Sequence, residues 1–160
     1  DSKAGQENTA KTGIFNWRKG IKLSFPFSIH YYGPYSSELN YAIHRLEMQG
    51  VLIINPEGMT HQISLTEDVG LIREEEEETL SREELPLIED VIAKFATKSA
   101  YDLEVITTTD YVAQQLKTNG ELLDKNSLIQ GVRKIKGEKF TQVKIGEAIT
   151  ILQEEGYLEL

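Results

Sequence analysis

Three histidines are the side chains best suited to metal binding or proton transfer, because the chain has no cysteine. His30 and His61 fall on predicted strands, and His44 falls on the helix predicted between them, so one hypothesis is that they converge on a metal. The rival hypothesis is that they are ordinary surface residues. His30 lies in the polar phase of its strand, and His44 stands next to Arg45 on a helix face predicted to be exposed. The surface interpretation is favoured, and no metal or other cofactor is expected.

The short motifs that carry much of known catalysis do not occur in the sequence. There is no G-x-S-x-G elbow, no phosphate-binding P-loop, no G-x-G-x-x-G fingerprint and no H-E-x-x-H zinc motif. The absence of cysteine also removes thiolate nucleophiles, disulfides and cysteine-ligated zinc. Pairs of carboxylates are frequent, but among 26 acidic residues such pairing carries little information. The sequence therefore favours a protein that is not an enzyme.

A cluster of tyrosines beside a Gly-Pro bend is the first candidate binding site. Tyrosine gives a rigid amphipathic surface at low entropic cost, which protein interfaces favour. The bend precedes a predicted helix whose free N–H groups can meet an acidic group of a partner. The alternative is that the rings pack this helix onto the sheet, with Tyr31 in the core and Tyr35 exposed. The residues assigned to the protein-interaction site are Tyr32, Gly33, Pro34, Tyr35 and Ser36.

A cluster of basic residues around Phe140 is the second candidate, and its ligand would be a nucleic acid. The cluster precedes a helix that Thr141 is placed to cap, so its side chains are positioned to contact phosphates. The rival interpretation is a solvated helix end that balances the acidic part of the chain, and the overall charge favours it. The residues of this alternative site are Arg133, Lys134, Lys136, Lys139 and Lys144.

The net charge of -9 is concentrated in the middle of the chain. Residues 65–98 hold 11 of the 26 acidic residues, including the run from Glu74 to Glu78, against 4 of the 17 basic ones. DNA-binding domains usually show the opposite balance, so binding of duplex DNA by the whole domain is disfavoured. No apolar run approaches the ~18 residues of a membrane span, and no charged-then-apolar leader is present. The expected location is the cytoplasm, without a membrane contact.

The clearest local pattern follows the Gly-Pro bend. Apolar residues recur at helical spacing from Leu39 to Leu46, which predicts a helix over residues 37–49 that ends at Gly50. The elements expected next are a strand over 51–54, a turn over 55–58 and a strand over 60–65. The helix pattern and its terminal glycine recur at identical spacing from Ile145 to Leu158, which is interpreted as a common helix stop rather than a duplicated recognition unit.

The predicted fold class is α+β, with a winged-helix-like unit and a small antiparallel sheet followed by a helical half. Helix, strand, turn and strand in this order are typical of a winged helix, with the turn as the tip of the wing. The sheet is expected to combine residues 27–32, 51–54 and 60–65. The predicted organisation is a disordered segment over 1–12 and a single domain over 13–160, divided into a winged-helix-like part (13–66) and a helical part (67–160).

Residues 27–39, with the sequence F-S-I-H-Y-Y-G-P-Y-S-S-E-L, resemble the Panacea domain family. Two later stretches are similar as well: K-S-A-Y-D-L-E over 98–104, and Phe140-Thr141 through Gly156-Tyr157-Leu158. The family gathers phage-associated, antitoxin-type and uncharacterised prokaryotic proteins. The resemblance implies a mostly helical, winged-helix-like domain that acts through protein contacts, with no catalytic residues to carry over. Residues 11–23 depart from the helix with which the family usually begins.

The favoured function is a non-enzymatic protein-interaction module, antitoxin-like or adaptor-like, whose partner is a protein. The alternative is a winged-helix DNA-binding transcriptional regulator, supported by the order of the elements and by the basic cluster. The outward positions of the helix include one dependable cation, Arg45, and the wing tip carries Glu57 without lysine or arginine. A wing on DNA normally meets phosphates with cations, so the sequence favours a protein partner.

Overall fold

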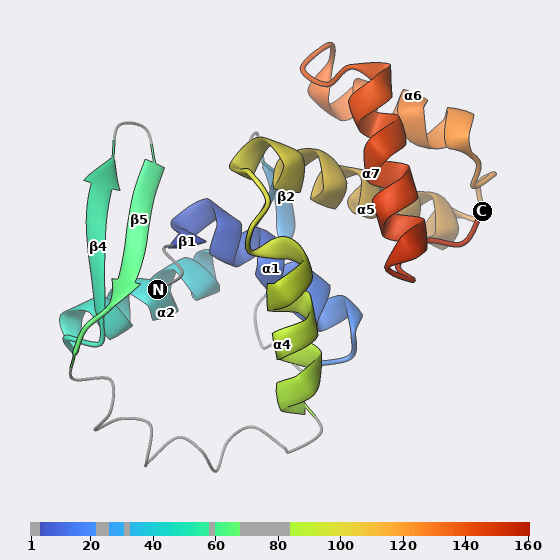
Figure 1. Cartoon of the computed structure of the whole chain (residues 1–160). Coiled ribbons are helices and arrows are strands. Elements are labelled where there is room, and N and C mark those ends of the chain that lie inside the picture. The colour runs from blue at the N-terminus through green and yellow to red at the C-terminus, as the bar shows by residue number, and fades with distance from the viewer. Residues whose placement is uncertain (1–3, 22–25, 31–32, 58–59, 68–83) are drawn as a thin grey trace. The chain divides into compact units, whose positions relative to one another are not determined.

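The computed structural model describes residues 4–21, 26–30, 33–57, 60–67 and 84–160 (Figure 1). These residues form six helices and two small antiparallel sheets, which confirms the α+β class. The strands are β1 (Ala4–Gly5), β2 (Ser28–His30), β3 (Gly33–Tyr35), β4 (Leu52–Glu57) and β5 (Thr60–Leu65). The helices are α1 (Gln6–Arg18), α2 (Ser37–Met48), α4 (Glu84–Phe95), α5 (Ala100–Asn119), α6 (Lys125–Lys136) and α7 (Gln142–Glu154).

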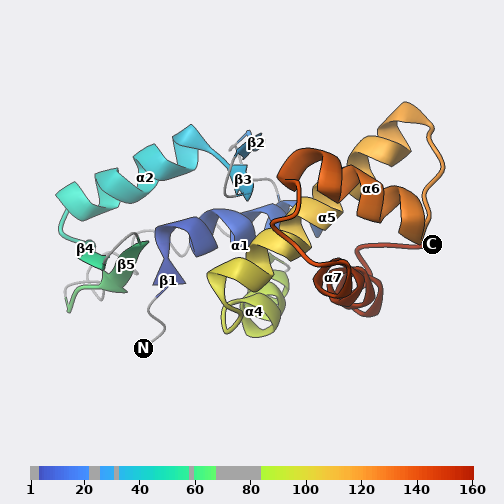
Figure 2. The same cartoon turned by 90° about the horizontal axis from the view of Figure 1, so that it is seen from above.

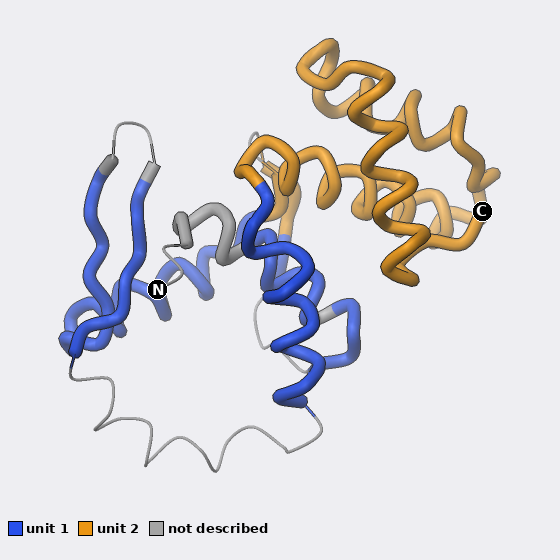
Figure 3. Tube along the Cα trace, in the orientation of Figure 1, with its two compact units in different colours: residues 1–27, 35–98 blue, residues 28–34, 99–160 orange. Residues whose placement is uncertain are grey.

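The chain divides into two compact units, and the division differs from the predicted boundary at residues 66 and 67. The first unit combines residues 1–27 and 35–98, and the second combines residues 28–34 and 99–160 (Figure 3). Helix α4 was expected in the helical half but belongs to the first unit, where it packs against α1. The rings of Phe15 and Phe95 stack there with their centroids 4.1 Å apart. Long-range packing of this kind leaves no signal in the local sequence pattern.

Three strands in the order β1-β5-β4 form the sheet of the first unit. The hairpin of β4 and β5 is confirmed, and its register pairs Leu52 with Leu65 and Ile54 with Ile63. The third strand is Ala4–Gly5, which pairs with β5. The prediction that residues 27–32 supply it was wrong, because β2 pairs with β3 in a sheet of their own. Segments so near in sequence lose little entropy when they pair.

Part of the segment that was predicted to be disordered, residues 1–12, belongs to helix α1. Residues 6–12 are helical, and Lys11, Ile14 and Phe15 are buried in the first unit. These three positions share one helix face. The sequence did not predict this face, because one charged and two apolar residues among small polar ones do not form a recognisable hydrophobic pattern.

Helix α2 confirms the clearest sequence pattern. The Ser36 side chain caps the helix by accepting a hydrogen bond from the Leu39 backbone N–H at 3.3 Å. Ile43 is buried and faces the unit's interior. At the other end, Gly50 has φ +74° and the Val51 N–H donates to the Leu46 carbonyl at 2.9 Å, which is a Schellman stop. The helix and the hairpin that follows are confirmed, and the complete winged-helix arrangement remains a prediction.

The repeated pattern near the C-terminus forms the same helix stop. Gly156 has φ +72°, and the Tyr157 N–H donates to the Leu152 carbonyl at 2.8 Å. After Gly50 the chain enters β4, whereas no strand follows Gly156 in the described part of the chain. This difference agrees with the interpretation that the two stretches share a stop signal and not a recognition unit.

The second unit is built on α5, against which α6 and α7 pack (Figure 2). Leu103, Ile106 and Val112 are buried. Three consecutive threonines also lie in the buried stretch. The Thr107 and Thr109 hydroxyls donate to the carbonyls of Leu103 and Val105, each at 2.7 Å, which satisfies polar groups that would otherwise oppose burial.

Asp124 begins α6 as its N-cap, and this makes part of the stability dependent on pH. Its carboxylate accepts the Ser127 backbone N–H at 2.7 Å. The hydrogen bonds from Ser127, the backbone bond first, hold the pKa of Asp124 below its usual value. The folded state therefore favours the ionised form. This stabilisation is complete above the unfolded pKa of about 4 and is lost as the pH falls through the lower folded value.

We therefore expect Asp124→Ala to lower the melting temperature at pH 7, because the cap is lost, and to lower it less near pH 3. Asp124→Ser is the matched control, since serine caps a helix but does not titrate in this range. It should keep most of the stability at pH 7 and should also reduce the pH dependence below pH 4. Thermal unfolding followed by circular dichroism at both pH values measures these changes. An equal loss at pH 3 and pH 7 for Asp124→Ala would contradict this role.

Within the described part of the chain, no helix has the length and apolar character needed to cross a bilayer.

Candidate functional site

The basic cluster at the end of α6 is largely occupied by contacts inside the second unit. Lys136 Nζ lies 3.0 Å from Glu104 Oε1, and Lys139 Nζ lies 2.7 and 2.9 Å from the two oxygens of the same carboxylate. The side chains of Glu104 and Lys136 are only 6% and 3% exposed. A single buried carboxylate thus pairs with two of the five cations assigned to nucleic-acid binding.

The same two lysines also bind backbone carbonyls and an aromatic ring of this unit. The Lys136 ammonium donates to the His30 carbonyl at 3.1 Å, and the Lys139 ammonium lies 5.9 Å from the centroid of the Phe140 ring. Tyr101 contacts that ring edge to face at 5.4 Å, and its hydroxyl donates to the Lys139 carbonyl at 3.3 Å. These contacts fix the turn between α6 and α7 against α5.

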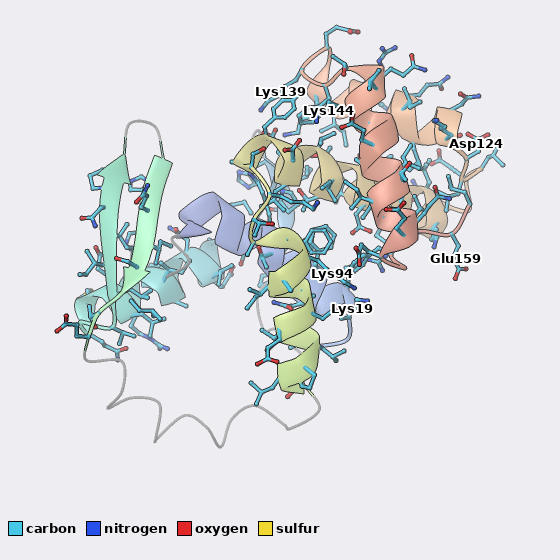
Figure 4. The ribbon with its side chains drawn as sticks, viewed as in Figure 1. Lys19, Lys94, Asp124, Lys139, Lys144 and Glu159 are labelled. Carbon is cyan, nitrogen blue, oxygen red and sulfur yellow. The ribbon has the colours of Figure 1, made fainter. Side chains whose placement is uncertain are left out.

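Lys144 is also paired, although it lies nearer the surface (Figure 4). Its ammonium lies 2.8 Å from Glu147 and 3.2 Å from Asp102. These two hydrogen bonds, the one to Glu147 first, raise the pKa of Lys144 above its usual value. Arg133 and Lys134 are exposed, and neither forms an ion pair with a described residue. Two cations with no fixed partner are too few for a phosphate-binding surface of ordinary strength.

The residues predicted as a tyrosine interaction site differ in their burial. Tyr32, like Tyr31, lies outside the described residues. Gly33 and Pro34 are buried in the second unit, whereas Ser36 is buried in the first as the cap of α2. Tyr35, also in the first unit, is 38% exposed, as the sequence predicted. Two of the four described residues, Gly33 and Pro34, are therefore buried, and a third, Ser36, caps α2.

The three histidines lie apart from any metal-binding group within the described residues. His30 and His61 are exposed on β2 and β5. His44 is exposed on α2, and its Nδ1 lies 3.2 Å from Glu47 of the same helix. The observed positions are those of surface residues.

Among the described residues of the first unit, the outer face of α2 carries the two most exposed large apolar side chains, and the sequence did not point to it. We use this name for the solvent-facing residues Glu38, Tyr41, Arg45 and Met48. Tyr41 is 81% exposed and Met48 is 88% exposed. The signal was available, because both residues lie opposite the buried Ile43 in helical phase.

The outer face of α2 is held on a rigid support. The cap at Ser36 and the stop at Gly50 fix both ends of the helix. Its inner side packs against β4 and α1. Glu38 is oriented by hydrogen bonds from the Ser37 and Ser36 hydroxyls at 3.1 and 3.4 Å. A partner that binds here meets a preformed surface, which limits the entropy lost on association.

Neither a protein-family model nor a curated protein matches this chain. The resemblance of residues 27–39 to the Panacea domain family therefore remains a prediction.

Proposed function

We propose that this protein is a non-enzymatic protein-interaction module that binds its partner through the outer face of α2. The observation that carries the proposal is the exposure of Tyr41 and Met48, 81% and 88%, on one face of a capped helix. Burying each of these side chains on a partner would contribute ~1.5–3 kcal/mol. Tyrosine and methionine are also enriched at the centres of protein interfaces. An adaptor-like or antitoxin-like role in the cytoplasm is the form of this function that the resemblance implies.

A DNA-binding role is the second candidate, because α2 and the hairpin of β4 and β5 follow one another as in a winged helix. The charges of these elements argue against it. Arg45 faces solvent together with Glu38, and residues 52–65 contain no lysine or arginine. The basic cluster cannot compensate, since Lys136 and Lys139 are bound to Glu104. Phosphate contacts require free cations in larger number.

The proposal predicts that Tyr41→Glu abolishes partner binding while the protein stays folded. A charge in place of an apolar anchor opposes desolvation at the interface. The exposed position keeps the change in melting temperature small. Leu122→Glu is the matched control, because Leu122 is 72% exposed but belongs to the second unit. The measurement is capture from the native host's lysate on immobilised full chain, with retained proteins compared among the wild type and both variants.

Proteins retained by the wild type and by Leu122→Glu but lost with Tyr41→Glu would support the proposal. Equal retention by all three would place the contact elsewhere and overturn it. Tyr35→Ala tests the sequence-based alternative, which would lose the partner with that variant instead. A duplex-DNA shift assay at two salt concentrations tests the second candidate. Steeply salt-dependent DNA binding, with no protein retained, would reverse the ranking.

A further inference from the structure

The outer face of α2 has the spacing of a helix–helix contact. Glu38, Tyr41, Arg45 and Met48 follow one another at intervals of three, four and three residues. This spacing keeps side chains on one line along a helix, and two such lines interlock when helices pack side by side. In α2 the line carries one acid, one base and two large apolar side chains, all exposed.

We propose that the partner of this face is a second copy of the same chain, bound by antiparallel packing of the two α2 helices. The inference rests on the proposed function and names the partner of the same surface. Glu38 and Arg45 are seven residues apart, about 10.5 Å along the helix at 1.5 Å per residue. A twofold axis midway between them places Arg45 of each copy opposite Glu38 of the other. Tyr41 lies next to that axis, so the two Tyr41 rings meet at its centre.

Charge complementarity selects a second copy and this orientation. Parallel packing would place Glu38 against Glu38 and Arg45 against Arg45, which is repulsive at both ends. Antiparallel packing pairs each charge with its opposite, and a twofold axis makes the arrangement correct in both copies at once. The line of contact is electrically neutral, although the chain as a whole carries -9. Association along this line therefore avoids the repulsion that acidic surfaces would cause elsewhere.

The apolar residues complete the contact. Met48 lies beyond Arg45, at the end of the helix. In the antiparallel arrangement it reaches the start of the other copy's helix, where Tyr35 directly precedes the cap Ser36. A thioether against an aromatic ring is a favourable contact. One helix from each copy buries a small area, so the dimer is expected to be weak and concentration-dependent.

The test is a charge exchange followed by sedimentation of the purified full chain. Between ~1 µM and ~1 mM the wild type should shift from monomer to dimer. Glu38→Arg and Arg45→Glu should each weaken dimerisation roughly tenfold, because both symmetric pairs become repulsive. The double variant, Glu38→Arg with Arg45→Glu, should restore it, since the charges are again opposite. Leu122→Glu should dimerise like the wild type.

A chain that stays monomeric throughout this range would overturn the inference. So would single variants that weaken dimerisation without recovery in the double variant, because only a self-pairing face restores both contacts. A dimer that persists in Tyr41→Glu would place the contact elsewhere. Failure here is distinguishable from failure of the proposed function: a monomeric chain that still loses lysate proteins with Tyr41→Glu refutes the second copy as partner but supports a different protein on the same face.

Discussion

Replacing Glu104 with glutamine should lower the free energy of unfolding by about 3 kcal/mol or more, the range seen when one partner of a buried ion pair is removed. Its carboxylate faces two ammonium groups within 3.0 Å. Without that charge, the Lys136 ammonium, whose side chain is 3% exposed, loses an ion pair of 3.0 Å. Weakening the pairing of a buried cation is costly in a medium of low polarity. Equilibrium urea unfolding of the full chain measures the change.

Glu147→Gln is the matched control for this experiment. Glu147 also pairs with a lysine, Lys144, but its side chain is 53% exposed. Solvent screens such a pair, so the variant should unfold almost like the wild type. The double variant Glu104→Gln with Lys136→Met should recover much of the lost stability, because it removes the buried cation together with its carboxylate partner. A Glu104→Gln protein as stable as the wild type would show that the cluster does not hold the second unit together.

Replacing Gly131 with alanine should destabilise the protein even though alanine favours helices. Gly131 lies in α6 where the helix meets α5, and a Cβ placed there would overlap Cγ1 of Val112. Valine in a helix has one strongly preferred rotamer and cannot turn away freely. Overpacking costs ~1–3 kcal/mol and the gain in helix propensity returns ~1 kcal/mol, so a net loss of up to about 2 kcal/mol is expected.

An alanine at Gly146, in the same unit, is expected to have the opposite effect on stability. It lies within α7, and the nearest atoms to an added Cβ are at the end of the Lys125 side chain, 4.0 Å away. Gly146→Ala should therefore raise the free energy of unfolding by ~0.5–1 kcal/mol through helix propensity alone. Gly131→Ala with Val112→Ala should unfold less easily than the sum of the two single losses indicates. If Gly131→Ala stabilises the protein as Gly146→Ala does, then α5 and α6 are not in close contact at this point.

Much of the candidate site was within reach of sequence reasoning, although the sequence pointed to the tyrosine bend and the structure points to the outer face of α2. The helix that carries the candidate site and its stop at Gly50 were predicted. Tyr41 and Met48 were not predicted, because the expectation for the outward side of the helix rested on its polar and charged residues. In the predicted tyrosine site, Gly33 and Pro34 are buried and Tyr35 is exposed. The types of these residues suit a protein interface, but only the exposed ones are accessible to a partner.

Local patterns in the sequence determined the α+β class, helix α2, the hairpin of β4 and β5, and the helix stops. Helical period, cap chemistry and turn residues act within a few positions, so they can be recognised without the rest of the chain. Tertiary structure alone decided that residues 4–5 join the sheet and that α4 packs on α1. It also decided that Lys136 and Lys139 turn inward to Glu104, more than 30 residues away in the sequence. The physical reason is common to these cases: a side chain's environment depends on which distant segment covers it, and sequence period specifies a face but not its partner.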